Sequence, residues 1–564
     1  MKYRLLVLFC WISLAWLSGQ KTTNLPLNDD THRILERLEI KISNFSDLHN
    51  QIKPVSRRDA RSFVVQADTF DWGSRSRRSQ FDIAYVLNDN NDEDSTTRRS
   101  KKPFLKRFYR SPAHLYEVRG KHLYLNINPI FHFTVGVERH RRAYNLIFLN
   151  RRGVAVRGNI ADKIYFYTDI IDSQAGYPTY VRDRILAEAA VPGMGFYKQY
   201  NSSFTAAQND GVDYLMAQGS IGFSIIKQIG MQMGHGRNFI GSGYRSLFLS
   251  DFSSNYFYLK FNTRVWKIHY QNIFAELIQN HERGSNRVFP KKYMTAHYLS
   301  IHILKNLNLG LFETVIFDRK NGFELQYLNP LILYRFVEQA VGSPDNVLLG
   351  LSWQYNFLKR FSFYGQFILD EFSFRQKTTT NPAEKGWWAN KYGLQAGIKY
   401  IDVAGVDHLD LQVEYNTVRP YTYTFRDSSA NYTHYNQPLA HPLGANFQEL
   451  IAILNYRPAP KLRIRVQWNY ARYGLDTLES NWGKNVHLPY GTREQEYGNR
   501  TGQGIRTNLF IGLLWASYQI RHNLYLDLQY RYRREKAILD TLDHTAHILS
   551  FGVRWNISER LNSF

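Results

Sequence analysis

Apolar and polar residues alternate with a period of two along most of the chain from about residue 121 onward. The alternation is clearest in three segments, 409–416, 463–470 and 526–533. A period of two is typical of a β-strand with one apolar and one polar face. Each run is about ten residues long, the length that a tilted strand needs to cross the hydrocarbon layer of a membrane. The pattern predicts membrane-spanning strands with one face toward lipid and the other toward a polar lumen.

A soluble antiparallel sandwich also alternates, so it is the competing interpretation of the same pattern. Long strands, a polar face that repeatedly carries arginine and acidic residues, and aromatic residues near strand ends favour a membrane barrel, whose interfaces carry aromatic girdles. The predicted girdle residues are Tyr258, Trp266, Trp353, Tyr355, Tyr364, Trp387, Trp388, Trp468, Tyr470, Tyr473, Trp515, Tyr518 and Trp555.

An open sheet edge in lipid would leave backbone groups unpaired, at several kcal/mol each, so the predicted sheet must close. Residues 121–564 allow about 25 residues per strand with its share of loops, and bacterial barrels have an even number of strands. The predicted fold is therefore all-β and transmembrane: a closed antiparallel β-barrel of about 18 strands. The mean hydropathy of −0.43 excludes a membrane protein built from many apolar helices.

The start of the chain has the pattern of a secretory signal. Lys2 and Arg4 precede an apolar run, 5–17, and the small pair Ser18 and Gly19 follows it. We predict a signal peptide over 1–19 that is cleaved on export. Its removal takes away Cys10, the one cysteine, and two positive charges, so the net charge falls from +23 to +21.

Between the signal and the strands, two further regions are predicted. Residues 20–70 are predicted as a helical leader, because 31–48 and 56–66 show helical spacing after residues that can cap a helix; the periplasmic side for this leader follows from the family resemblance given below. Residues 71–120 are predicted as a charged linker or flap, since Arg, Ser, Asn and Asp dominate there. An arm that binds nucleic acid is disfavoured, because an exported chain meets no ordinary nucleic-acid partner.

Three stretches without strand alternation, 234–251, 325–351 and 434–449, are the places to look for function, because loops on a rigid scaffold carry most binding groups. Turn-rich loops folded into the barrel mouth are the alternative, with arginine and acidic residues that pair with one another. For each single residue this pairing role is favoured over ligand contact. The candidate glycan-binding residues are Arg237, Asn238, Tyr244 and Arg245 in the first stretch and Asn436, Gln437 and His441 in the third.

No pattern indicates catalysis or a metal site. His235, Ser250 and Asp251 are near one another in sequence, but such groupings arise by chance. There is no HExxH motif, and residues 88–94 lack the glycine and glutamate spacing of a calcium loop. We therefore predict a protein that is not an enzyme, with no catalytic residue, metal or cofactor.

Several segments, spread over the mature chain, resemble one family. The chain is similar to the capsule assembly Wzi family of outer-membrane barrels, in the form found in Bacteroidetes, whose relatives include gliding motility proteins of the RemB type. The segments that carry the resemblance are IKPVSRRDA (52–60), GHGRNFIGSGYRSLFLSD (234–251), LQYLNP (325–330), GSPDN (342–346), YGQFILDEF (364–372), EYNTVRPYTY (414–423) and QPLAHPLGANFQE (437–449).

The resemblance implies an 18-stranded barrel in the outer membrane with a small helical region on the periplasmic side. It also implies a lectin-like role in holding or assembling surface polysaccharide, either capsule or lipopolysaccharide. Such glycans often carry carboxylates or phosphates, which arginine and lysine attract. The expected partners are this polysaccharide, outer-membrane lipid and, given the gliding relatives, motility or adhesin proteins. A gliding-motility scaffold or a passive porin is the alternative, and a barrel hydrolase a more distant one.

Overall fold

In the computed structural model, the described residues are 22–45, 48–69, 76–92, 108–140, 143–201, 211–279, 288–319, 322–330, 334, 337, 342, 345–539, 543–560 and 563–564. The predicted signal peptide, 1–19, lies outside them. Within the stretch 325–351, the sequence also predicts a short helix over 331–341, and most of these residues likewise lie outside the described ones.

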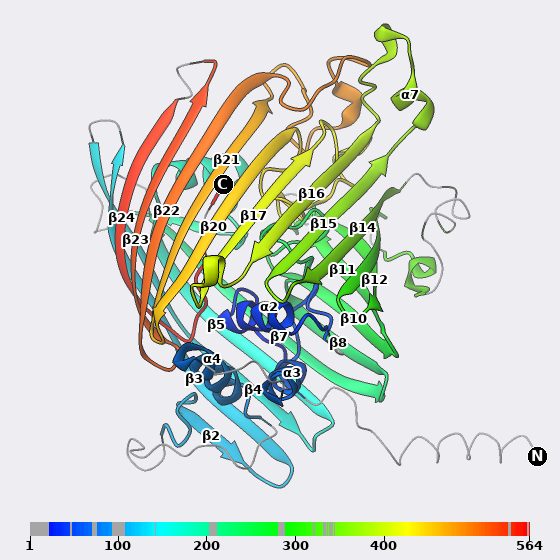
Figure 1. Ribbon diagram of the computed structural model, residues 1–564. Helices are drawn as coiled ribbons and strands as arrows, with labels where there is room; N and C mark the ends of the chain where they lie inside the picture. Colours follow the sequence, from blue (N-terminus) through cyan, green and yellow to red (C-terminus); the bar gives the residue numbers. More distant parts are fainter. Residues whose placement is uncertain are drawn as a thin grey trace, which may run out of the picture.

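Eighteen long antiparallel strands close into a barrel within the described residues (Figure 1). The last strand pairs with the first long one, from Ala546 opposite His140 to Trp555 opposite Phe131. This confirms the predicted closed 18-stranded fold. The strands are β3 (Leu123–His140), β4 (Ala143–Ile160), β5 (Ile164–Gly176), β7 (Gly211–Ile226), β8 (Ile229–Gly236), β10 (Tyr256–Val265), β11 (Ile268–Ile278), β12 (Lys291–Leu304), β13 (Leu307–Phe317), β14 (Asn346–Phe357), β15 (Phe361–Glu371), β16 (Lys391–Tyr400), β17 (Leu409–Val418), β20 (Phe447–Ala459), β21 (Leu462–Leu475), β22 (Ile505–Arg521), β23 (Leu524–Ala537) and β24 (His544–Trp555).

Shorter elements join or cap this wall. Two short strands extend its ladders: β2 pairs with β3, and β6 pairs with β7. The short elements are β1 (Ile52–Lys53), β2 (Tyr116–Arg119), β6 (Lys198–Tyr200), β9 (Phe239–Ile240), β18 (Thr433–His434), β19 (Gln437–Pro438), α5 (Thr179–Glu188), α7 (Phe374–Thr378), η1 (Leu325–Leu328), η2 (Pro382–Glu384), η3 (Val403–Gly405) and η4 (Tyr490–Thr492).

The alternation sorts side chains between the two faces of the wall as predicted. On β21, Trp468 and Tyr470 are 45% and 47% exposed and point outward, whereas Gln467 and Asn469 are buried in the lumen. The aromatic girdle is smaller than the sequence suggested, because position within a strand decides the face. Four of the predicted girdle residues are buried on the inward side: Tyr258, Tyr364, Tyr473 and Trp515.

The two ends of the barrel differ in the length of their connections. At one end the strands are joined by short turns, such as 161–163, 266–267 and 522–523, and at the other by longer loops, such as 372–390 and 476–504. Outer-membrane barrels have short periplasmic turns and longer extracellular loops. We therefore name the short-turn end the inner end and the long-loop end the outer end.

Three helices lie at the inner end: α2 (Asp30–Ile42), α3 (Arg57–Thr69) and α4 (Arg77–Asp89) (Figure 1). The Asp29 side chain accepts from Thr31 N at 2.7 Å and caps α2, and Ser56 caps α3 by accepting from Asp59 N at 3.1 Å. Both helices were predicted. Apolar residues of all three helices share one small core, which includes Leu35, Val64 and Val86. Within the described residues, no helix is both long and apolar enough to span a bilayer.

The segment predicted as a charged linker or flap, 71–120, contains a helix over residues 77–89, which is α4. Ser76 caps this helix by accepting from Ser79 N at 3.2 Å. Ile83, Tyr85 and Val86 are buried, so the helix has an apolar face within a charged sequence. The apolar face was not evident from the sequence, because charged residues are normally solvated. Here Asp82 and Asp89 are buried and pair with arginines.

Candidate functional site

The lumen is filled from the outer end by two long loops, 237–255 and 419–446, which we call the outer plug. Tyr423 and Tyr432 donate from their hydroxyls to the carbonyls of Leu247 and Phe248, each at 2.8 Å. The Ser250 amide donates to the Leu439 carbonyl at 2.8 Å. Two tyrosine hydroxyls and one backbone bond therefore hold the two loops to each other inside the barrel.

Of the candidate residues in the first loop, Arg237 and Asn238 bond to groups of the chain itself. Arg237 donates from Nη1 to the carbonyl of Asp251 at 3.0 Å. Asn238 is fully buried and accepts from Lys260 Nζ at 3.0 Å through Oδ1. Arg237 thus holds the loop to itself, and Asn238 holds it to β10 of the wall.

Tyr244 and Arg245 sit over two buried glutamates of the barrel wall. Their backbone amides donate to Glu414, at 2.6 Å to Oε2 and 3.0 Å to Oε1. The Arg245 guanidinium pairs with Glu449 at 3.1 Å, and the Tyr244 hydroxyl is 3.1 Å from Ser563 Oγ. The wall glutamates thus fix the backbone of this turn and the Arg245 side chain.

The third predicted stretch supplies a second ligand to the same glutamate. His441 Nε2 lies 2.7 Å from Glu449 Oε2, so His441 and Arg245 meet on one carboxylate. Burial lowers the pKa of His441 to about 4, against the opposing effect of Glu449. Gln437 accepts from Gly193 N at 2.8 Å. Asn436, the residue before it, donates to the Glu188 carbonyl at 2.9 Å.

The seven candidate residues therefore do not converge on one ligand-sized space. Of the seven, Arg237, Tyr244 and Arg245 line the lumenal cavity described below, and all seven have partners within the chain. Their role in binding a glycan stays a prediction, and the observed geometry gives them a role in holding the outer plug.

The end of the chain strengthens the outer plug. After β24, residues 556–560 turn back into the lumen, where Figure 1 shows the C-terminus. Arg560 donates to the carbonyls of Gly193, Asp251 and Phe252 at 2.9–3.0 Å. Phe564 is 6% exposed, and the Arg184 guanidinium lies 4.3 Å from its ring centre.

The helices at the inner end form a second plug, the inner plug, held to the wall by ion pairs. Arg37 of α2 is buried and pairs with Asp402, Asp407 and Asp410 around the β16–β17 turn, the Asp407 contact being 3.5 Å. Burial alone would raise the pKa of Asp402, but the Arg37 charge lowers it to about 2.

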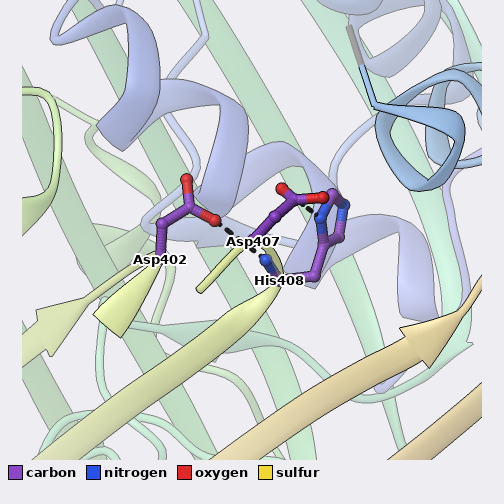
Figure 2. Close-up of side chains that lie close together, drawn as sticks. All are labelled: Asp402, Asp407 and His408. Carbon is purple, nitrogen blue, oxygen red and sulfur yellow. Dashed lines mark hydrogen bonds and ion pairs between the residues drawn. The ribbon is translucent and has the colours of Figure 1, made fainter. Parts of the chain in front are cut away.

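Figure 2 shows Asp402 and Asp407 beside His408 in this turn, an arrangement of oxygen and nitrogen atoms that resembles a metal site. His408 donates its backbone N–H to Asp402 at 2.9 Å, and its Nδ1 is 2.7 Å from Asp407. Arg37 already supplies a positive charge to both carboxylates. The cluster is therefore a docking point for α2, and nothing in it requires a cation.

Further ion pairs join α2 to other strands. Lys399 of β16 and Lys53 each lie 2.7 Å from a carboxylate oxygen of Glu36. These two cations outweigh the effect of burial and lower the pKa of Glu36 to about 2. Arg463 of β21 pairs with Asp30, at the first residue of the helix. The inner plug is thus bound by charge to neighbouring strands of the wall, from β16 to β21.

A cavity of about 440 Å³ lies between the two plugs, and we call it the lumenal chamber. Twelve arginine and lysine residues and seven aspartate and glutamate residues line it. Cavities of this size hold small molecules. The chamber therefore combines room for a ligand with an excess of positive charge.

A second feature, the rim platform, lies in the loops at the outer end and consists of Trp387, Trp388, Tyr490 and Arg493. The Trp388 and Tyr490 ring centres are 4.8 Å apart, and the Arg493 guanidinium lies 4.3 Å from the Trp388 ring. Loop 372–390 is tied to loop 476–504 by the Trp388 N–H to Glu496 carbonyl bond of 2.9 Å. All four side chains are half-buried, so the rings are held firmly and part of each stays accessible.

The sequence interpretation placed these two tryptophans in a membrane girdle and so missed the platform. They lie in a loop that begins after β15 ends at Glu371, rather than in a strand. The Trp-Trp pair next to Gly386, with a lysine and a glutamate before it, was the signal that could have indicated a loop.

Fold and plugs together define a class: an 18-stranded β-barrel whose lumen is occupied by its own chain. No protein-family model matches the sequence, and no curated protein matches it. Among solved structures, the fold is similar to that of Wzi from Escherichia coli, whose structure is described as an outer-membrane protein involved in group 1 capsule assembly and a carbohydrate-binding β-barrel. The TM-score is 0.57 at 15% identity, covering 96% of this chain and 100% of Wzi.

Lower similarity extends to other barrels. OprD of Pseudomonas aeruginosa matches with a TM-score of 0.41 at 10% identity, over 76% of this chain and 94% of OprD. OccAB2 of Acinetobacter baumannii matches with a TM-score of 0.42 at 9% identity, over 78% of this chain and 99% of its own. The predicted resemblance to Wzi is confirmed at the level of the fold. The Bacteroidetes type and the relation to motility proteins stay predictions.

Proposed function

We propose that this protein is a non-enzymatic outer-membrane barrel that binds surface polysaccharide and helps to anchor or assemble it. The rim platform is the observation that carries the proposal. Aromatic faces pack on the apolar faces of sugar rings, and the Arg493 guanidinium with its exposed partner Glu496 adds polar groups beside them that can bond to sugar hydroxyls. The fold, shared with a carbohydrate-binding barrel over its whole length, supports the same function.

The outer plug and the inner plug argue against a passive porin. Wide barrels conduct when their lumen is an aqueous channel and not when it is plugged. Here loops, helices and the end of the chain occupy the lumen of an 18-stranded wall. Planar-bilayer recording of the purified barrel is expected to show no steady open-pore current, and a large constant conductance would favour a porin instead.

Glycan binding by the purified barrel in detergent tests the platform directly. Trp388→Ala is expected to weaken binding of isolated surface polysaccharide by about tenfold, since buried aromatic anchors carry most of the affinity of a binding surface. Trp266→Ala is the matched control: Trp266 is 78% exposed in a turn at the inner end. Equal affinity of both variants and the wild type would refute the platform as the binding surface.

In cells, deletion of the gene is expected to release polysaccharide from the surface into the medium. The same strain separates the alternative, a scaffold for motility or adhesin proteins. That alternative requires loss of gliding with normal retention of polysaccharide. Retained polysaccharide in the deletion strain would overturn the anchoring role.

A further inference from the structure

A cluster of cationic groups on the wall of the lumenal chamber surrounds one tryptophan. Arg33 of α2, Arg463 and Arg465 of β21, and Trp515 of β22 all line the chamber. The guanidinium carbons of Arg463 and Arg465 lie 4.6 and 5.7 Å from the centre of the Trp515 ring. Arg554 of β24 lies 5.9 Å from the same ring. A helix and two strands therefore bring four guanidinium groups to the chamber wall, with Trp515 on a third strand among them.

Several N–H donors in this cluster have no acceptor within the described part of the chain. The Trp515 side chain is 2% exposed, and its indole Nε1 is one of these buried donors. Nε and one terminal nitrogen of Arg33, and Nε of Arg463, are the others. Buried donors are normally satisfied, so such a group of unpaired donors calls for an acceptor that the protein does not supply.

The carboxylates nearby are too few to neutralise the cluster. Asp30 pairs with Arg463, and Asp527 pairs with Arg554 at 2.9 Å. Arg465 instead donates to the neutral amide oxygen of Asn455 at 3.0 Å. Glu559, on the chain segment after β24, also lines the chamber, 3.9 Å from Arg554. Four guanidinium groups thus face three carboxylates, and Arg33 and Arg465 have no carboxylate of their own among the ion pairs of the described chain.

We propose that Arg33, Arg465 and Trp515 form an anion site, named the lumenal anion site, that binds a phosphate group. The donors approach from a helix and from two strands, and this spread of directions suits a tetrahedral oxyanion. Arginine forks bind phosphate through paired charge-assisted hydrogen bonds, and the indole adds a neutral donor. The phosphate is either a free ion or the terminal group of a sugar phosphate. This site does not depend on the rim platform, which lies at the outer end of the barrel.

Isothermal titration calorimetry on the full-length barrel in detergent tests the site with inorganic phosphate and with glucose 6-phosphate. The variants are Arg465→Gln, which removes the charge, and Trp515→Phe, which keeps an aromatic ring but loses the N–H. Arg152→Gln is the matched control, because Arg152 is 55% exposed in an ion pair with Asp172 outside the chamber. Retained heat-modifiable migration of each variant on gels shows that the barrel is folded.

The wild type is expected to bind one phosphate group per chain with saturation. Arg465→Gln should weaken binding about tenfold and Trp515→Phe about threefold, as loss of charged and neutral hydrogen bonds predicts, with Arg152→Gln unchanged. Tighter binding of glucose 6-phosphate would identify a glycan terminus as the ligand. Tighter binding of inorganic phosphate would identify the free ion. No saturable binding of either, or folded Arg465→Gln equal to the wild type, would overturn the site. Polysaccharide binding at the rim platform would be untouched by that result.

Discussion

The inner plug and the outer plug close the same barrel by different physical means. The inner plug is a set of helices with its own apolar core, attached to the wall by ion pairs such as those of Arg37 and Glu36. The outer plug has no separate core: its loops share the main core and bond to buried glutamates and backbone carbonyls of the wall and of each other. The outer plug is therefore part of the barrel fold. The inner plug is a separate unit whose attachment to the wall depends on ion pairs.

The largest effect is expected where the outer plug depends on one buried carboxylate. Glu449→Ala removes the shared partner of Arg245 and His441, and leaves the buried Arg245 charge without its carboxylate. Breaking a buried pair in this way costs about 3–5 kcal/mol. Thermal and urea unfolding of the barrel in detergent should show the loss, with the whole barrel destabilised rather than a separate unit.

Glu479→Ala is the control for this prediction, since Glu479 is exposed in an outer loop. It should leave the unfolding midpoint unchanged. A barrel lacking Glu449 that unfolds like the wild type would remove the distinction between the two plugs.

A smaller and more local effect is expected at the inner plug. Arg37→Ala leaves three carboxylates together without their common cation, and should weaken docking of the helices by about 2–3 kcal/mol, since the carboxylates retain some contact with water. Limited proteolysis should then cut the helical region while the barrel stays resistant. Lys41→Gln, which loses a more exposed contact of 3.3 Å with Asp402, should change cleavage little.

Docking of the inner plug is also expected to depend on pH through His49. This buried residue stacks on His302 of the wall, with ring centres 3.9 Å apart. Burial, with the charges of His302 and Arg264, lowers the pKa of His49 to about 2, so it is neutral in the folded state. The unfolded histidine binds a proton below about pH 6.5, so stability is full above that pH and falls as pH decreases, by about 1.4 kcal/mol per pH unit at most.

Proteolysis of the helical region between pH 7.5 and 5.5 measures this dependence. His49→Gln should reduce it, because the substituted side chain takes up no proton, while the buried His32 of α2 keeps its own contribution. An unchanged pH dependence in this variant would show that the stacking contact between His49 and His302 does not control docking.

At pH 5 the smallest effect is expected at Glu39 of α2, which is fully buried. Burial and the charge of Glu36 raise the pKa of Glu39 to about 8, so its carboxyl is protonated at neutral pH. The pKa of Glu39 is higher in the folded state than in the unfolded state. The contribution of Glu39 to stability is therefore complete below about pH 4.5 and is lost as the pH rises through 8. Glu39→Gln should leave docking nearly unchanged at pH 5 and strengthen it at pH 9, as the same proteolysis assay would measure.

Sequence reasoning succeeded wherever a local period decides the outcome. The alternation on β21 placed Trp468 outward and Gln467 inward, and helical spacing with a cap located α2. It failed for α4, because Asp82 and Asp89 are charged residues buried by arginines distant in sequence. It also failed for Trp515, whose size suggested a girdle although its place in β22 turns it into the lumen.

The candidate site shows the same limit. The sequence selected Arg245 and His441 as polar loop residues, but nothing local reveals that both meet Glu449. The platform was hidden because Trp388 and Tyr490 belong to loops about a hundred residues apart in the chain.

By itself, then, the sequence determined the closed antiparallel barrel, the face of most strand residues and the helical leader, since these depend on periodicity and on the need to pair every backbone group in lipid. Only the tertiary structure decided that the lumen is occupied from both ends, which charges pair, and which aromatic rings meet at the rim. These features depend on contacts between residues hundreds of positions apart, such as Arg37 with Asp402, which no local pattern encodes.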